Sequence, residues 1–406
     1  MVFKCQSDSY LKEFVSKVVS CDKVPPDPKK PPKEDQYEVI LEDTILFPEG
    51  GGQPCDYGFL NSIPVNKVIR KADKAIHITK EGFSLGQEVK QTIDWKRRFD
   101  HMQQHSGQHL ITALIDKEFE FPTVSWWLGE DVSYIELDTK SITENQIREA
   151  EGKINELIRN GKKVTVEVYT KDTPEEELKQ VRARGLPEDH KGDIRVINIE
   201  DLERNMCCGT HVTNLSQLQM VKLLHSEKSK RKDKTFLYFL VGNRVLDKLS
   251  QCIDTERKLT TILKNNSLQH PDLVEKLQKN VKTLTKNLQI ANRDAALIIA
   301  EKLKNSTTNY FSMFREIGDV DFINTLIREC AKRKDLLLFL GVGDPKTVGN
   351  FVLYGPENDV KCLGQEVCNI LEGKGALNGN KYFAKANKML NWDKADAFIK
   401  DYLKNE

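Results

Sequence analysis

Three histidines stand four residues apart in HMQQHSGQH: His101, His105 and His109. Residues at i and i+4 share one face of an α-helix, with Cβ atoms about 5–6 Å apart, so two such imidazoles can bind one metal ion. A second pair with this spacing, Cys207 and His211, lies in NMCCGTHV. A thiolate and an imidazole complete a His₃Cys set, and these ligand types suit Zn²⁺. The sequence therefore predicts one zinc ion per chain.

The elements that position these residues can also be predicted. Leu110, Ala113 and Leu114 have helical spacing and indicate a helix after Asp100 that carries the histidines. The apolar run DIRVINIED predicts a strand that ends shortly before the Cys–His pair. The cysteine and its histidine would thus follow a rigid element.

The expected fold class is α+β, because helices and strands are mixed without regular βαβ alternation. The apolar residues of the heptad run from Val274 to Ile298 have the 3-4 spacing of a coiled coil or a long antiparallel helix pair. Four segments are expected: a β-rich N-terminal domain with a glycine-rich segment (1–97), a zinc-binding domain (98–245), a helical linker (246–306) and a small C-terminal α/β domain (307–406).

Composition excludes several classes of protein. Apolar residues make up 39% and charged residues 30% of the 406 residues, an ordinary globular balance. The net charge is +1, so a polyanion would have to bind local basic patches. The sequence has no apolar run long enough for a transmembrane helix and no signal peptide, so no membrane partner is expected. Nine cysteines without regular spacing suggest reduced thiols and a cytoplasmic location.

The motifs carry a resemblance to a known family. HxxxH followed by CxGTHV resembles the metal signature of the editing domains of alanyl-tRNA synthetases and of their free-standing relatives, the AlaX proteins. LFPEGGGQPCDYG is similar to a segment characteristic of the same family. The resemblance covers about residues 1–245. The long AlaX class is the nearest type, because a helical linker and a C-terminal domain follow.

The resemblance selects among the histidines and cysteines. The family has Leu or Ile directly after its second histidine, so Leu110 selects His105 and His109 over a pair that begins at His101.

The cysteine is selected in the same way. Cys208 stands where the family usually has glycine, so either thiolate is a candidate, and the spacing from His211 selects Cys207. The implied ligands are His105, His109, Cys207 and His211.

The resemblance implies a hydrolase that edits tRNA in trans. A synthetase cannot reject an amino acid with one extra hydroxyl by binding alone, so a second site must hydrolyse the wrong ester. The implied substrate is tRNA(Ala) mischarged with serine or glycine, and serine is expected to be preferred. The zinc site itself would carry the chemistry, and the sequence names no further catalytic residue.

Several residues are candidates for substrate binding. Glycines without side chains let backbone N–H groups approach a ribose or carboxyl group, although a tight hairpin turn needs glycine equally. Thr210 would contact a serine hydroxyl or support the neighbouring ligand. The candidates are Gly50, Gly51, Gly52, Gln53 and Thr210.

Contacts to the tRNA are expected at three places. The basic turn at 228–234 would meet phosphates or be an ordinary solvated turn. Trp126 and Trp127 would stack on an unpaired base, with at least one of them in the core. The C-terminal segment resembles the C-terminal domain of alanyl-tRNA synthetases, also called the DHH-associated domain, which implies tRNA binding or homodimer formation. Its loop LEGKGALNGNKYFAKANK offers Lys374 and Lys381 to phosphates, or is an ordinary turn.

Two other functions compete with this interpretation. Threonyl-tRNA synthetase editing domains share the HxxxH and CxxxH spacing, but the FPEGGGQP segment favours the alanyl type. A zinc-stabilised tRNA-binding module without catalysis is the other alternative, and the complete ligand set argues against it.

Overall fold

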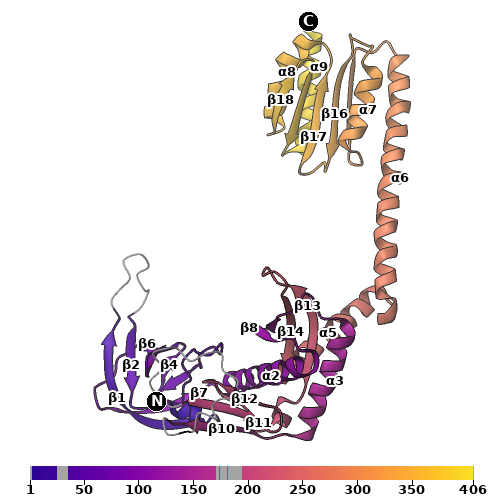
Figure 1. The fold of residues 1–406 in the computed structure, drawn as a ribbon. Coiled ribbons are helices and arrows are strands. Elements are labelled where there is room, and N and C mark those ends of the chain that lie inside the picture. Colours follow the sequence, from indigo (N-terminus) through magenta and orange to yellow (C-terminus); the bar gives the residue numbers. More distant parts are fainter. Residues whose placement is uncertain (1, 25–34, 171–172, 174–180, 182–193, 406) are drawn as a thin grey trace. The chain divides into compact units, whose positions relative to one another are not determined.

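The computed structural model describes residues 2–24, 35–170, 173, 181 and 194–405. The chain forms two compact units, residues 1–257 and 258–406. Helices and strands are mixed in both units (Figure 1), as the predicted fold class requires. The finer division into four segments stays a prediction.

The first unit begins with a short helix, α1 (Lys4–Ser7), and an antiparallel sheet of order β4-β3-β7-β1-β2-β6-β5. Alternating side chains of β1 and β2, such as Val18 and Val39, are buried in its core. Its strands are β1 (Glu13–Lys23), β2 (Tyr37–Leu41), β3 (Gly58–Leu60), β4 (Ile63–Val65), β5 (Val68–Lys71), β6 (Lys74–Thr79) and β7 (Glu88–Ile93).

Helix α2 (Trp95–Phe119) follows this sheet and lies at the centre of the unit. It begins at Trp95, before the predicted start after Asp100, because the Asp94 side chain caps it by accepting a hydrogen bond from Arg97 N. A second antiparallel sheet, of order β13-β14-β9-β8, packs against α2. Its strands are β8 (Thr123–Leu128), β9 (Ser133–Leu137), β13 (Val221–Lys228) and β14 (Thr235–Val241).

Helix α3 (Glu144–Asn160) is amphipathic, as predicted. Thr143 and Gln146 form its capping box, and Gly161 ends it in the left-handed conformation. Its apolar face joins α2 and the second sheet in one core.

The remaining elements of the unit are β10 (Val164–Tyr169), β11 (Ile194–Ile199), β12 (Glu203–Met206) and the 3₁₀ turn η1 (Leu215–Leu218). Helix α5 (Asn243–Leu263) follows, and the boundary between the two units falls within it. Strands β10, β11 and β12 form a third sheet.

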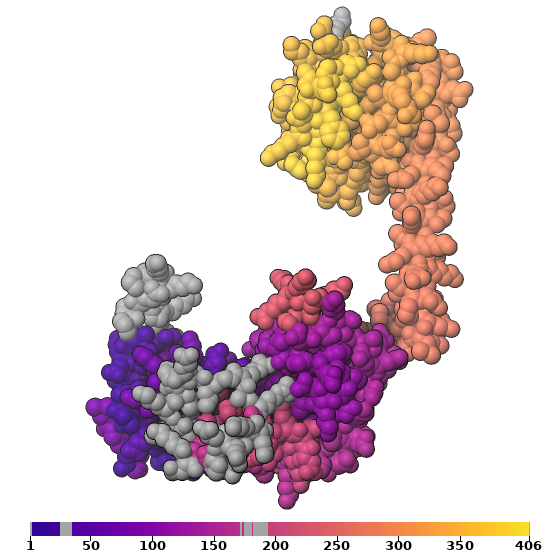
Figure 2. All heavy atoms as spheres, viewed as in Figure 1, coloured from indigo at the N-terminus to yellow at the C-terminus, as the bar shows by residue number. Residues whose placement is uncertain are grey.

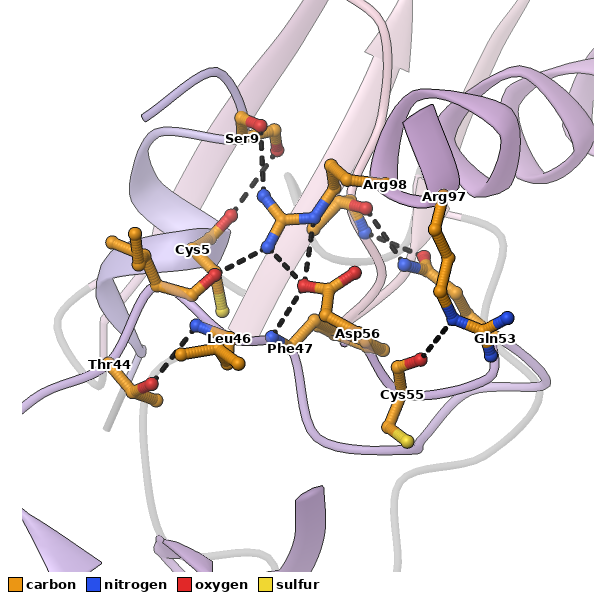
Figure 3. Close-up of polar contacts among 12 residues, drawn as sticks. Cys5, Ser9, Thr44, Leu46, Phe47, Gln53, Cys55, Asp56, Arg97 and Arg98 are labelled. Carbon is orange, nitrogen blue, oxygen red and sulfur yellow. Dashed lines mark hydrogen bonds and ion pairs between the residues drawn. The ribbon is translucent and has the colours of Figure 1, made fainter. Parts of the chain in front are cut away.

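A buried ion pair connects the glycine-rich segment to α2 (Figure 3). Arg98 Nε donates to Asp56 Oδ2 at 3.0 Å, and both side chains are fully buried. Arg98 also donates to the carbonyl oxygens of Ser9 and Ile45. Asp56 Oδ2 accepts a further hydrogen bond from Phe47 N, while Asp56 N donates to Phe47 O. The segment from Phe47 to Asp56 is thus closed at its base and fixed to the helix that carries the histidines.

The second unit contains a five-stranded sheet of order β15-β16-β17-β19-β18, with helices on both faces. Alternate residues of β16 serve two cores: Leu338 and Leu340 pack towards α6 and α7, whereas Leu337 and Phe339 pack towards α8 and α9. The elements are η2 (Ser267–Gln269), α6 (His270–Lys304), β15 (Tyr310–Arg315), α7 (Val320–Cys330), β16 (Leu337–Gly343), β17 (Gly349–Tyr354), α8 (Glu357–Ile370), β18 (Lys374–Asn378), β19 (Lys381–Ala386), η3 (Met389–Asn391) and α9 (Trp392–Lys404).

Helix α6 contains the predicted heptad run. Its second half packs on α7 through Ala296, Ala300 and Leu303. The heptad residues of its first half are exposed, at 40% for Val274 and 65% for Leu284. Figure 2 shows α6 as the orange segment that precedes the C-terminal sheet. The apolar stripe predicted from the sequence is therefore present, but it is not the face by which α6 packs on its own unit.

The glycine-rich segment near the C-terminus contains the ordinary turn that was one of its two interpretations, at Gly379, instead of a phosphate-binding loop. Residues 374–386 form the antiparallel hairpin β18–β19, because Tyr382, Ala384 and Ala386 alternate into the core. Lys374 and Lys381 lie at opposite ends of this hairpin, and Lys381 Nζ donates to Asn324 Oδ1 at 2.9 Å. The structure does not bring the two lysines together as a phosphate-binding loop would.

None of the helices in the described parts of the chain combines the length and the apolarity that crossing a membrane requires.

The division into two units makes a prediction about truncation. A fragment that ends after Arg257 should fold and retain the ligand cluster, because all four candidate ligands and their supporting contacts lie within the first unit. Cooperative thermal unfolding and circular dichroism measure this. An unfolded fragment would show that the second unit completes the core of the first.

The buried ion pair makes a second prediction. Arg98→Met should lower the free energy of unfolding by about 3–5 kcal/mol, because it leaves the Asp56 carboxylate buried without its cation. The matched control is Arg148→Met, which removes an exposed pair with Glu144 and should change stability little. Denaturant titration of both variants gives the comparison, and equal stability losses would contradict the role of the pair.

Candidate metal centre and adjoining pocket

Four donor side chains from two distant parts of the chain converge in the first unit. Helix α2 supplies His105 and His109 from successive turns, and the loop after β12 supplies Cys207 and His211. One ligand atom from each lies within 4.8 Å of all the others. The three histidines are buried and Cys207 is partly buried. The structure therefore brings together the four residues that the sequence singled out.

The distances suit a single small cation. Cys207 Sγ lies 3.4 Å from His105 Nε2 and 3.2 Å from His211 Nε2. The His109 ring is 5.2 Å from that of His105 and 4.9 Å from that of His211, measured between centroids. Donors bound tetrahedrally to Zn²⁺ at about 2.0–2.3 Å would have comparable separations. The three imidazoles and the thiol thus fit a zinc ion in both type and arrangement.

Each candidate histidine ligand has a second residue at its other ring nitrogen. His105 Nδ1 lies 3.0 Å from Gln53 Oε1, and His211 Nδ1 lies 3.1 Å from Ser106 Oγ. Glu203 Oε2 lies 3.6 Å from His109 Nδ1. Such partners fix the orientation of a ligand imidazole and raise its basicity. All three Nε2 atoms are consequently left for a metal.

Gln53 and Thr210 belong to this supporting layer. Both are fully buried. Gln53 Nε2 donates to Thr210 Oγ1 at 2.8 Å, and Thr210 N donates to Gln53 Oε1 at 2.9 Å. Their polar atoms thus contact each other and His105. Of the two roles that the sequence left open for Thr210, the structure favours support of the ligands.

The three glycines form the tight turn that was the alternative interpretation. Gly50 and Gln53 exchange two backbone hydrogen bonds of 3.1 Å, and Gly51 and Gly52 have φ values of 61° and 78°. A Cβ on Gly52 would lie 2.4 Å from Trp126 Nε1, so the turn packs closely on that ring. Gly51 lines the pocket beside the cluster. The segment therefore makes a turn and also contributes part of the pocket wall.

The two alternative ligands lie outside the cluster. His101, one turn before His105 on α2, is buried but is absent from the group of converging ligand atoms. Cys208 points towards the glycine turn, where a Cβ on Gly51 would lie 2.8 Å from its Sγ. Burial raises the pKa of the Cys208 thiol. These positions agree with the choice of Cys207.

The electrostatics of the cluster favour a cation. Burial acts against the Cys207 thiolate, but the nearby imidazoles of His105, His211 and His109 outweigh it and hold the pKa of this thiol well below its usual value. Burial lowers the pKa of His211 to about 3, so this ring is neutral and able to bind a metal. Burial also lowers the pKa of His109, but Cys207 and Glu203 outweigh it and raise that pKa to about 9. Positive charge is thus favoured between Cys207 and Glu203.

A small pocket of about 140 Å³ adjoins the cluster. Gln108 Oε1 is buried in its wall without a hydrogen bond from any described residue, whereas Gln108 Nε2 donates to Thr112 Oγ1 at 2.9 Å. Sequence analysis missed Gln108, because a glutamine between two ligands is not itself a motif. The lining residues are Gly51, Gln108, His109, Thr112, Trp126, Asn205, Met206, Cys207 and Cys208.

The two tryptophans have different surroundings. Trp126 lines the pocket, while Trp127 is 55% exposed on the other face of the strand. The basic run lies at the turn between β13 and β14, as predicted, and most of its side chains are exposed.

Comparison with known proteins places the chain in a family. Residues 194–238 match the family model of the threonyl and alanyl tRNA synthetase second additional domain. Alanyl-tRNA editing protein Aarsd1-B from Xenopus laevis is 47% identical over 96% of this chain and 95% of its own length. Alanyl-tRNA editing protein Aarsd1 from Mus musculus is 45% identical over 100% of this chain and 99% of its own length.

More distant proteins show partial similarity. Alanyl-tRNA editing protein AlaX-L from Pyrococcus horikoshii is 30% identical over 68% of this chain and 66% of its own length. The C-Ala domain of Aquifex aeolicus alanyl-tRNA synthetase aligns with 23% of this chain and 87% of that domain, at 15% identity and a TM-score of 0.21, which is too weak to support a conclusion. The near full-length relatives decide the assignment: the chain belongs to the alanyl-tRNA editing protein family.

Proposed function

We propose that this protein is a trans-editing hydrolase that deacylates mischarged tRNA(Ala), chiefly Ser-tRNA(Ala), and that this activity depends on one zinc ion. The family is one of editing enzymes, and the sequence identity to its members extends over nearly the whole chain. The observation that carries the proposal is the buried His₃Cys cluster with a pocket of about 140 Å³ beside it. Such a pocket has room for a small aminoacyl group, while the rest of a tRNA would remain outside.

The reaction is hydrolysis of the ester between the amino acid and the 3′-terminal ribose. When bound, zinc supplies a Lewis acid that polarises a carbonyl or lowers the pKa of water, or it holds the substrate in place. His105, His109, Cys207 and His211 would hold the ion, and Gln53 would orient His105. The chain's own contribution is to fix these buried rings beside the pocket.

Selection of serine over alanine requires a polar group placed for the hydroxyl. Gln108 Oε1 is buried in the pocket wall and accepts no hydrogen bond from the part of the chain that the structure describes. Thr112 holds the amide of Gln108 by accepting from Nε2, and Thr112 Oγ1 lies 3.1 Å from Thr123 Oγ1. A serine hydroxyl would donate to this oxygen, whereas alanine would leave it unsatisfied at a cost of about 1–3 kcal/mol. Glycine lacks the hydroxyl, so Gly-tRNA(Ala) would be a poorer substrate.

Two alternatives are weighed against this function. Editing of a threonyl-type substrate would use the same ligand spacing, and the matching family model covers both threonyl and alanyl enzymes. The full-length relatives are named for alanyl-tRNA editing, which favours tRNA(Ala). A zinc-stabilised binding module would require the four ligands. It would not require a pocket with a polar atom, Gln108 Oε1, that accepts no hydrogen bond from a described residue.

The remaining proposals concern location and partners. All nine cysteines are free thiols, which fits a reducing, cytoplasmic location. We retain the second unit as a tRNA-binding or dimer-forming part, with Lys374 and Lys381 as separate contacts to phosphates. The exposed apolar stripe on the first half of α6 supports a homodimer through this region.

Removal of ligands should remove the metal. His105→Ala and Cys207→Ala should lower the zinc content from about one per chain to near zero and abolish deacylation, because each deletes one of four donors. Cys208→Ala is the matched control and should retain zinc, since its Sγ points towards Gly51 instead. Elemental analysis of the purified variants measures this. Loss of zinc in the Cys208 variant with retention in the Cys207 variant would reverse the assignment.

Substitution of Gln108 should reduce the preference for serine. Gln108→Met keeps the size of the side chain and removes its polar atoms, so kcat/KM for Ser-tRNA(Ala) should fall roughly 5- to 100-fold. Zinc content and the slow reaction with Ala-tRNA(Ala) should stay unchanged. Gln251→Met on α5 is the control, because Gln251 is exposed and lies outside this pocket. Equal rates of wild-type protein on the seryl and alanyl substrates would contradict the editing function itself.

A further inference from the structure

Four aromatic rings form a continuous row across the second sheet, which we call the aromatic ladder: Trp127 on β8, Tyr134 on β9, Tyr238 on β14 and His225 on β13. The ring centroids are 5.7 Å apart from Trp127 to Tyr134, 5.7 Å from Tyr134 to Tyr238, and 4.7 Å from Tyr238 to His225. Trp127 and His225, at the two ends, are exposed, and the tyrosines between them are half-buried.

Strand register puts these rings on one face. Trp127 pairs with Tyr134, and Tyr134 pairs with Tyr238, so side chains from neighbouring strands point the same way. The intervening residues Ile135 and Leu237 point to the other face and enter the core beneath α2. The ladder is therefore not needed to fill that core. Its outer face is exposed at Trp127 and His225 and partly exposed at the two tyrosines.

Positive charge lies on the turn that joins the two strands carrying His225 and Tyr238. The turn between β13 and β14 carries exposed Lys228, Lys230 and Lys232, none of which forms an ion pair with another described residue. The other two basic residues of the turn form ion pairs: Arg231 with Glu136 at 3.2 Å and Lys234 with Asp138 at 2.6 Å.

Two carboxylates also lie on this face. Glu136, two residues after Tyr134 on β9, is buried and forms an ion pair with Arg231. Glu227 accepts from Tyr238 OH at 3.1 Å and lies 3.3 Å from His225 Nε2, so its charge is held at the His225 end of the ladder. The three lysines without an ion pair to a described residue outnumber Glu227, while Arg231 balances Glu136.

The other end of the ladder adjoins the metal pocket. Strand β8 is the edge of its sheet, and side chains along it alternate between the two faces. Trp126 lines the pocket beside the metal ligands, and the next residue, Trp127, begins the ladder. A flexible strand that ends in the pocket can therefore pass over the edge of β8 and continue along the rings.

We propose that the aromatic ladder binds the unpaired 3′ tail of the aminoacyl-tRNA substrate, with the bases on the rings and the phosphates near the lysines of the β13–β14 turn. This inference rests on the proposed editing function and extends it from the amino acid to the nucleic acid. Exposed aromatic rings beside free cations are the combination by which proteins bind single strands. A paired helix has no free base faces for the rings, so the ladder selects an unpaired strand. The ladder positions the tail and takes no part in ester hydrolysis.

The test uses the full-length protein and a short single-stranded RNA that ends in the CCA sequence of tRNA. Trp127→Leu should weaken binding of this RNA about five- to tenfold, because it removes a stacking ring while keeping an apolar side chain. Trp127→Phe keeps a ring and should bind nearly as the wild type does. Phe59→Leu is the matched control: Phe59 is 48% exposed on β3, outside the ladder. His225→Ala tests the opposite end at an exposed position and serves if the Trp127 variants fold poorly.

Two further measurements assign the contacts. Replacing Lys228, Lys230 and Lys232 together by glutamine should reduce the slope of log affinity against log salt by about 2, since each phosphate contact to a single strand contributes about 0.7. In deacylation, Trp127→Leu should raise KM for Ser-tRNA(Ala) about five- to tenfold and leave kcat unchanged. Hydrolysis of a seryl ester of adenosine, which has no tail, should not change.

The outcomes separate this inference from the proposed function. If the wild type binds the RNA through Trp127 but deacylates no substrate, the ladder stands and the editing function fails. If the wild type deacylates Ser-tRNA(Ala) while Trp127→Leu and His225→Ala leave both RNA affinity and KM unchanged, the ladder is not a tail-binding surface. A change in oligomeric state without a change in RNA affinity would also overturn the inference, because it would make this face a contact between proteins.

Discussion

The burial of three imidazoles and a thiol at one point is the constraint on which the first unit depends. Polar groups removed from water need partners, and the described residues supply hydrogen bonds to the outer nitrogens of His105 and His211 and a carboxylate near that of His109. Gln53, Ser106 and Glu203 approach the outer nitrogens of the three rings, and Cys207 lies among the inner ones. Gly209 allows the loop to approach closely, because a Cβ there would lie 2.2 Å from the His105 ring. A cation at the centre would satisfy the nitrogens and the sulfur together.

The same constraint explains why α2 lies at the centre of the unit. A helix with buried polar residues around its circumference cannot lie on a surface, so sheets and loops must enclose it. Arg98 fixes the glycine-rich segment to α2 through Asp56, and that segment then places Gln53 beneath His105. The N-terminal sheet is therefore part of the site's support. Arg98 lies about two helical turns before His105 on α2. The buried pair of Arg98 and Asp56 therefore connects the position of Gln53 to that of its partner His105.

The cluster of four candidate ligands, which the structure brings together, could be predicted because its residues have fixed spacing and restricted chemistry. The same holds for other repeating patterns in the sequence. Sequence analysis also identified the heptads of α6 and the amphipathic α3, whose patterns repeat along one element. It placed the start of α2 too late, since a helix buried on all sides has little amphipathic periodicity. It missed the C-terminal hairpin because glycines indicated a loop, although Tyr382, Ala384 and Ala386 alternate as a strand requires. The aromatic ladder could not be predicted, because it depends on the register of strands that are distant in sequence.

The central claim is that one zinc ion is held by three histidines and one cysteine in this unit. X-ray absorption at the zinc edge of the purified full-length protein measures the ligand types and bond lengths directly. The account predicts one sulfur at about 2.3 Å and three nitrogens at about 2.0–2.1 Å, with the sulfur signal unchanged in Cys208→Ala. Two sulfur ligands, or a shell of nitrogen and oxygen alone, would contradict it.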